Sequence, residues 1–220
     1  MIYVIEDLKK IPILLVGFAF LAFGLFLMKE SLLGLSSWGV FHLGISKATG
    51  ISFGRVIQIV GIIILVLSVA LKIYPGIGTI LNIVFIGMFV DWFDQFIPQE
   101  TDHIIIQYAL LLLGMVITSY GRALYIMCEI GKGPRDGLFI GLTRMTGISV
   151  KYMKPMIEIL VLLIGFLMGG IVREGTLIVT LCSGYVLHFF FKIHRYDPKT
   201  AKQRQFKDYF KSSRLIKGRS

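Results

Sequence analysis

The chain has 220 residues, of which 55% are hydrophobic and 16% are charged, and its formal net charge is +10. Soluble globular domains average about 45–50% apolar and about 25% charged residues, so this composition excludes an ordinary water-soluble domain. Cys128 and Cys182 have no metal or redox spacing and are interpreted as small buried hydrophobic residues. We therefore expect an integral membrane protein, and we predict no cofactor and no metal site.

Six apolar runs follow one another along the chain, each near the roughly 20 residues that a helix needs to cross a bilayer. The first run has no small-residue cleavage site and is followed by further runs, so it predicts a retained helix and not a signal peptide. All six predict transmembrane helices in an all-α fold. The runs cover residues 11–28, 56–71, 73–90, 104–121, 155–172 and 175–191.

The two halves of the chain align at an offset of 97 residues without a gap. The offset repeats the Thr-Gly-Ile-Ser sequence of Thr49 at Thr146. It also repeats a seven-residue glycine spacing, which predicts close helix packing, at Gly17 and Gly24 and again at Gly114 and Gly121.

This repeat predicts three parts of the chain: a three-helix repeat at 1–97, a second at 98–191, and a basic tail at 192–220. Three crossings per repeat is an odd number and the linker between the repeats is short, so the second repeat is expected to be inverted. With both termini in the cytoplasm, nineteen Lys and Arg residues lie inside and four outside. That distribution agrees with the positive-inside rule.

A short segment precedes the second span of each repeat, at residues 37–48 and 134–145. If both segments crossed the membrane the chain would have eight spans, but twelve helical residues reach only about 18 Å. We predict half-helices that are either interfacial or re-entrant. The expected helix punctuation is Ser36 or Ser37 and Pro134 with Asp136 at the starts, Gly50 and Gly147 at the ends, and Ser52 and Ser149 as caps of the next spans.

Glu158 is the single charged side chain within the six runs. A charge at that depth costs at least ~2.5–3.5 kcal/mol, so Glu158 is interpreted either as a substrate or proton site or as a structural carboxyl. Arg122 is expected either to pair with Glu158 or to extend to the interface. The full set of predicted substrate-binding residues is Ser36, Ser37, Trp38, Gln58, Asn82, Arg122, Pro134, Arg135, Asp136 and Glu158.

The tail holds ten basic and two acidic residues with interleaved aromatic side chains. This pattern predicts a surface-lying segment whose partner is anionic lipid and not nucleic acid.

The segments at 33–40, 49–55 and 131–137 resemble the YczE branch of the bacterial YczE/YyaS/YitT membrane proteins. The resemblance extends over about residues 11–190. Ser37 and Gly39 stand where the family more often has Pro and Asp, which leaves Asp136 as the stronger polar candidate. The resemblance implies a bacterial plasma-membrane protein and supplies no catalytic residues.

Together these features predict a small secondary transporter, or a solute-binding membrane subunit, for an unknown small molecule or ion. The alternative is a non-transporting accessory protein that recruits a cytoplasmic partner through its basic tail. An enzyme is not expected, because the chain has no HExxH, GxSxG or phosphate-loop motif. Either function is compatible with a homodimer or a partner membrane subunit.

Overall fold

The computed structural model describes residues 2–96, 103–131, 133–198, 200–206 and 208. Every regular element in these ranges is an α-helix, which confirms the all-α prediction. The helices are α1 (Ile2–Glu30), α2 (Ser37–Thr49), α3 (Phe53–Ala70), α4 (Ile77–Phe96), α5 (Ile104–Met127), α6 (Pro134–Thr146), α7 (Val150–Leu167) and α8 (Glu174–Ile193).

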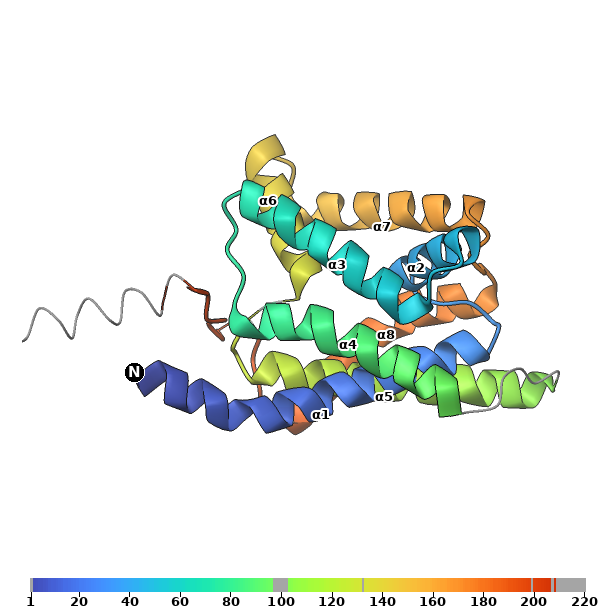
Figure 1. Cartoon of the computed structure of the whole chain (residues 1–220), viewed down its shortest axis with the longest axis horizontal. Coiled ribbons are helices and arrows are strands. Elements are labelled where there is room, and N and C mark those ends of the chain that lie inside the picture. The colour runs from blue at the N-terminus through green and yellow to red at the C-terminus, as the bar shows by residue number, and fades with distance from the viewer. Residues whose placement is uncertain (1, 97–102, 132, 199, 207, 209–220) are drawn as a thin grey trace, which may run out of the picture.

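The helices form two layers (Figure 1). One layer holds α1, α4, α5 and α8, and the other holds α2, α3, α6 and α7. Between the layers α3 packs along α4, whereas α7 and α8 hardly touch. The two layers are therefore joined more tightly on one side than on the other.

Five helices are long and apolar enough to cross a membrane, and they coincide with five of the six predicted spans. The remaining prediction, residues 155–172, falls on α7. Its boundaries were wrong, because α7 begins at Val150 and ends at Leu167, before Gly169 with its positive φ of 92°. The 18 residues of α7 include three charged side chains, Lys151, Lys154 and Glu158, whereas each of the other five helices contains an apolar stretch of 18 residues with at most two.

Large hydrophobic side chains cover much of the outer surface. Leu167 of α7, Leu177 and Leu181 of α8 and Ile105 of α5 are each at least two-thirds exposed. Extended apolar patches of this kind are unstable in water and are stable against lipid tails. The structure is thus that of a multi-pass membrane protein.

Glycines bring α1 and α5 close together, as their spacing predicted. A Cβ atom on Gly24 would lie 2.5 Å from the carbonyl oxygen of Gly114, and one on Gly121 would lie 2.5 Å from that of Gly17. The helices run antiparallel, because the earlier glycine of α1 meets the later glycine of α5. The two contacts are equivalent under the repeat: Gly24 and Gly114 of the first contact correspond, at an offset of 97 residues, to Gly121 and Gly17 of the second.

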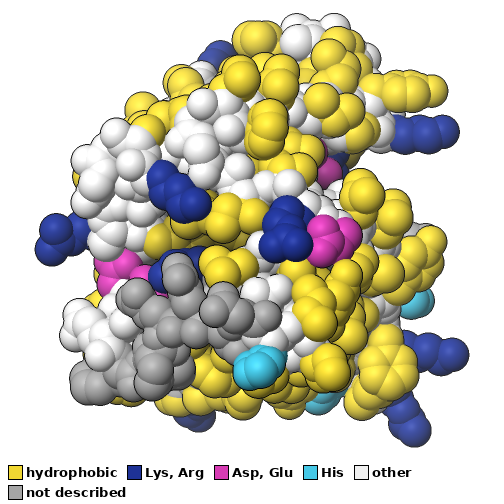
Figure 2. Space-filling model, turned by 90° about the vertical axis from the view of Figure 1, so that its right-hand side faces the viewer, with side chains coloured by type: hydrophobic (Ala, Val, Ile, Leu, Met, Phe, Trp, Pro, Cys, Tyr) yellow, Lys and Arg dark blue, Asp and Glu magenta, His cyan; other side chains and the backbone are white. Residues whose placement is uncertain are grey.

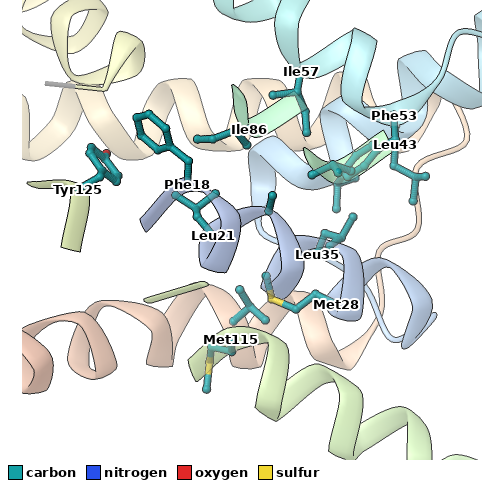
Figure 3. Packing of buried hydrophobic residues seen from close by; sticks show 14 of the residues in the cluster. Phe18, Leu21, Met28, Leu35, Leu43, Phe53, Ile57, Ile86, Met115 and Tyr125 are labelled. Carbon is teal, nitrogen blue, oxygen red and sulfur yellow. The ribbon is translucent and has the colours of Figure 1, made fainter. Parts of the chain in front are cut away.

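Buried apolar side chains fill the space around α1 and extend into both layers (Figure 3). A second cluster joins α2, α3, α6 and α7 within their own layer. Figure 3 labels Phe18, Leu21, Met28, Leu35, Leu43, Phe53, Ile57, Ile86, Met115 and Tyr125 from the first cluster.

The two predicted short helices are present as α2 and α6, each 13 residues long. Both end at a left-handed glycine, Gly50 with φ 72° and Gly147 with φ 75°. Ser52 and Ser149 then accept a hydrogen bond from a backbone N–H in the first turn of the next helix. Ser36 stands at the start of α2, but the predicted cap was wrong, because its hydroxyl makes no capping bond and borders a cavity instead.

The residues just before and just after the α2 segment both contact the same end of α4. Lys29, at the end of α1, pairs with Asp94 at 2.7 Å, and the Ser52 hydroxyl donates to the Asp91 carboxylate at 2.6 Å. Asp91 and Asp94 are about one helical turn apart. The segment between Lys29 and Ser52 therefore does not traverse the molecule, which argues against α2 as a crossing.

Candidate functional site: a cavity between the two layers

A cavity of about 380 Å³ lies at the centre of the molecule and is lined by residues from all eight helices. This volume falls in the range of about 300–1,000 Å³ that is typical of small-molecule sites. The structure brings nine of the ten predicted binding residues to its wall, from segments that are far apart in the sequence. They are Ser36, Ser37, Trp38, Asn82, Arg122, Pro134, Arg135, Asp136 and Glu158.

Gln58, the tenth predicted residue, lies away from the cavity, between α3 and α4. Its side-chain amide donates to the Val84 carbonyl at 2.8 Å, and it packs beneath Gly87. A polar residue in a membrane helix can equally well bind a neighbouring backbone, and the sequence does not distinguish the two.

Both half-helices begin at the cavity. Ser36 and Ser37 at the start of α2, and Gly133 and Pro134 at the start of α6, belong to its lining. Neither start has a side-chain cap. The first backbone N–H groups of a helix have no intrahelical acceptor and carry the positive end of the helix dipole. Two uncapped helix starts therefore contribute positive potential to the same space.

The Trp38 indole is a buried polar group on this wall whose N–H donor is unpaired. Its side chain is 6% exposed, and its indole Nε1–H has no hydrogen-bond acceptor. The Arg135 guanidinium lies over the indole ring, 4.6 Å from the ring centre. Because an indole nitrogen only donates, an unsatisfied donor is buried within this wall of the cavity, beside a cation.

The cavity wall carries three basic and two acidic side chains. Lys154 and Glu158 form an ion pair at 3.9 Å, one turn apart on α7. A pair between Arg122 and Glu158, one of the two alternatives predicted for Arg122, is not formed, and Lys154 on the same helix face is the nearer cation. Among the residues that the structure describes, no carboxylate lies within 4.0 Å of the guanidinium nitrogens of Arg122 or Arg135.

The cavity opens between α7 and α8, in a groove lined by Lys154, Glu158, Thr180, Ser183 and Gly184, which we call the α7–α8 groove. Figure 2 shows the end of the molecule opposite the N-terminus, where the surface is hollowed between its upper and lower parts and charged side chains lie in the recess. Lys154 and Thr180 are exposed there.

Sequence reasoning missed several residues of the wall. His42 follows Trp38 by one helical turn on α2, so the i, i+4 spacing offered a signal for it. Tyr125 stands near the end of an apolar run, where tyrosine is common at membrane interfaces. Thr180 and Ser183 are small hydroxyl residues inside a span, and the sequence cannot separate a cavity role from helix packing.

Residues 196–198 and 200–206, which we call the C-terminal strap, cross the end of the molecule at which α1 begins. Arg204 pairs with the buried carboxylate of Asp7 at 2.5 Å. The backbone N–H of Phe206 donates to the Pro75 carbonyl, between α3 and α4, at 3.0 Å. The predicted contact of the tail with anionic lipid also involves residues 209–220, which lie outside the described part of the chain.

Two further side chains fasten the C-terminal strap to the end of α5. Tyr196 and Gln203 both donate to the Ile126 carbonyl, at 3.3 and 2.9 Å. Burial, and then the nearby Glu129 carboxylate, raise the pKa of the Tyr196 phenol, so that it remains a donor at neutral pH.

Comparison with known proteins identifies one family. Residues 8–192 match the model of a family of unknown function, DUF6198. The chain is 33% identical to an uncharacterized protein of Haemophilus influenzae over 84% of each chain. It is 34% identical to the uncharacterized membrane protein YczE of Bacillus subtilis, over 79% of this chain and 81% of YczE. It is also 23% identical to the uncharacterized protein YyaS of the same organism, over 81% of this chain and 90% of YyaS. No solved structure matches the chain.

Proposed function

Because the chain belongs to the DUF6198 family, as a relative of YczE and YyaS and a multi-pass membrane protein, we propose that it is a small secondary transporter. Its solute binds in the central cavity between the two helix layers. The observation that carries this proposal is that two half-helices, one from each half of the chain, begin at one cavity that also collects nine predicted polar residues. Broken helices that meet at a central site are a common plan of secondary transporters.

The proposed architecture is six spans, with α7 as the fifth in chain order, arranged as two inverted three-helix repeats. Repeat-related contacts support it. The Gly78 N–H donates to the Ile130 carbonyl at 2.8 Å, and the Gly175 N–H donates to the Leu33 carbonyl at 2.9 Å. At an offset of 97 residues Gly78 corresponds to Gly175 and Ile130 to Leu33, so the two bonds are equivalent under the repeat, as are the antiparallel glycine contacts of α1 and α5. A two-fold relation between the repeats accounts for both.

The proposed orientation places both termini in the cytoplasm of a bacterial cell, with the protein in the plasma membrane. The C-terminal strap ties the tail to the start of α1, so the two ends of the described chain lie on one face. Most Lys and Arg residues belong to that side in the six-span topology, as the positive-inside rule requires.

The test is transport by the purified protein in proteoliposomes, with solutes first chosen by thermal stabilisation in detergent. If a proton gradient drives uptake through Glu158, then Glu158→Gln abolishes that uptake. Glu174→Gln is the matched control, because Glu174 is the first residue of α8 and lies outside the cavity. Full proton-driven uptake by Glu158→Gln contradicts the coupling role, and the absence of any transported solute contradicts the transporter.

The accessory function predicted as the alternative is tested by truncating the tail. Residues 196–206 brace the helical core, so their removal disturbs the fold as well as any partner site. Deletion of residues 209–220 is the cleaner experiment. A lost cellular phenotype with normal membrane insertion then favours the accessory function, and a retained phenotype favours the transporter.

A further inference from the structure

We infer that the central cavity binds an oxyanion, a carboxylate or phosphate group carried by the solute, and that Arg122, Arg135 and Trp38 are its donors. The inference rests on the proposed solute-binding role of the cavity and adds the chemical class of the ligand. Its basis is an excess of unpaired donors around one enclosed space.

Two guanidinium groups face the cavity without a carboxylate partner among the described residues. Arg122 and Arg135 come from different helices, α5 and α6, and lie close enough for their like charges to interact, while the Asp136 and Glu158 carboxylates act on Arg135 in the opposite sense. Two neighbouring cations repel each other unless an anion lies between them. Guanidinium groups also present a planar fork that matches a carboxylate or phosphate in two parallel hydrogen bonds.

The Trp38 indole supplies a third donor beside these cations. Its Nε1–H is buried and has no acceptor, and leaving a buried donor unpaired costs about 1–3 kcal/mol. A ligand oxygen would satisfy it by approaching Nε1 in the plane of the indole ring, beside the Arg135 guanidinium that covers the ring face. The uncapped start of α2 adds backbone N–H groups, and the starts of α2 and α6 both place positive dipole ends on the same wall.

The acidic residues of the wall do not cancel this field. Three basic side chains, Arg122, Arg135 and Lys154, share the wall with only two acidic ones, Asp136 and Glu158, so one positive charge is in excess. Asp136 is exposed and lies in the first turn of α6, where the helix dipole already stabilises a negative charge. The remaining charge of the cavity is positive, and its complement is a small anion.

An oxyanion can reach this cavity from two sources. A soluble carboxylate or phosphate enters from an aqueous face, whereas a lipid phosphate enters sideways through the α7–α8 groove. Both present the same chemistry to Arg122, Arg135 and Trp38, and the probes separate them.

The experiment measures thermal unfolding of the purified full chain in a neutral maltoside detergent at low salt. The probes are inorganic phosphate, succinate and phosphatidylglycerol, each compared with sodium chloride of equal ionic strength. Putrescine and glucose serve as cationic and neutral probes. We expect at least one oxyanion to raise the unfolding temperature, and we expect putrescine and glucose to have no effect. A response to phosphate or succinate assigns a soluble ligand, and a response to phosphatidylglycerol alone assigns a lipid headgroup.

Variants then locate the bound anion. Arg135→Gln and Arg122→Gln should each weaken the Kd of the active oxyanion at least about tenfold, and Arg135→Lys should weaken it less, because it keeps the charge but loses the fork. Trp38→Phe keeps a ring under Arg135 and removes only the indole donor, so we expect about a fivefold weaker Kd. Arg144→Gln is the matched control on α6, because Arg144 is exposed and lies outside the central cavity.

Only variants whose unfolding temperature without ligand stays near that of the wild type are compared. If an arginine variant does not fold, the Kd of Trp38→Phe is the deciding measurement. Equal stabilisation by putrescine or glucose, no response to any oxyanion, or an unchanged Kd in folded Arg135→Gln and Trp38→Phe overturns the inference. A transported solute without an anionic group overturns it and leaves the transporter intact. An oxyanion that binds at this site without being transported leaves the site intact and contradicts the transporter.

Discussion

The α3–α4 interface and the α7–α8 groove occupy equivalent places in the two halves of the chain, yet only the first is closed. At the α3–α4 interface, a Cβ on Gly87 would collide with the backbone oxygen of Gly54. Further along, Gly61 faces Ile83, which a Cβ would meet at 3.0 Å. Glycine thus lets two helix backbones approach where any larger residue would hold them apart.

Two of these three glycines are replaced by charged residues in the second half. An offset of 97 residues replaces Gly54 by Lys151 and Gly61 by Glu158, and nothing lies within 4 Å of a Cβ on Gly184. The helix pairs α3–α4 and α7–α8 correspond at the offset of 97 residues, so we attribute the difference in packing to their side chains. Glu158, which stands in place of Gly61, is too large for α7 and α8 to pack as closely as α3 and α4, and it places a charged side chain at the α7–α8 groove.

The largest effect that tests this comparison is expected from the repeat-related glycines Gly87 and Gly184. Gly87→Ala forces a Cβ against the Gly54 backbone oxygen, which cannot rotate away, so we expect a loss of about 3 kcal/mol of unfolding free energy. Gly184→Ala meets open space and gains helix propensity, so its effect should lie between zero and a stabilisation of about 1 kcal/mol.

Denaturation of both variants in mixed micelles measures the difference. Equal destabilisation by the two substitutions would mean that α7 and α8 are packed in solution as closely as α3 and α4. The conclusion that the two halves differ in helix packing would then be wrong.

A smaller effect is expected from the polar contacts at the end of the α3–α4 interface. Asp91 accepts a hydrogen bond from the Ser52 hydroxyl at 2.6 Å and from the Gly54 N–H at 2.7 Å. Asp91→Ala removes both, which should cost about 2 kcal/mol, since hydrogen bonds to charged groups contribute about 1.5–3 kcal/mol.

His188 is the matched control, because it takes the place of Asp91 in the second half and is exposed. We expect His188→Ala to change the unfolding free energy by less than about 0.5 kcal/mol. The same denaturation assay compares the two, and a larger loss in His188→Ala than in Asp91→Ala would reverse the comparison.

Local rules predicted much of this fold. The apolar runs located five spans, and the repeated Gly50 and Gly147 predicted where the half-helices end, because a left-handed residue favours glycine whatever packs around it. Depth and polarity brought nine of ten candidate residues to one cavity. These features depend on the chain's own periodicity and backbone.

The features that escaped prediction depend on contacts between distant segments. Gln58 and Asn82 look alike in sequence, but one binds the Val84 carbonyl and the other faces the cavity. The pairing of Glu158 with Lys154 required knowing that α7 begins at Val150, several residues before its apolar run. The role of His42 depended on which face of α2 turns inward.

The smallest change in stability is expected at Glu158, although its position distinguishes the groove from the closed interface. Its pair with Lys154 is 3.9 Å long, and the two side chains are 30% and 56% exposed, so solvent screens most of the attraction. We expect Glu158→Gln to change the unfolding free energy by less than about 0.5 kcal/mol at neutral pH.

Because Glu158→Gln is expected to change the unfolding free energy so little, it can separate a functional role of Glu158 from a structural one. If Glu158 mainly held the fold together, its removal would cost stability and transport in proportion. If it acts on the solute or on protons, transport falls while the denaturation midpoint stays within error of the wild type. A midpoint shift as large as that of Asp91→Ala would show that Glu158 is a structural carboxyl, and the α7–α8 groove would then be a packing defect of the second repeat and not an entrance to the cavity.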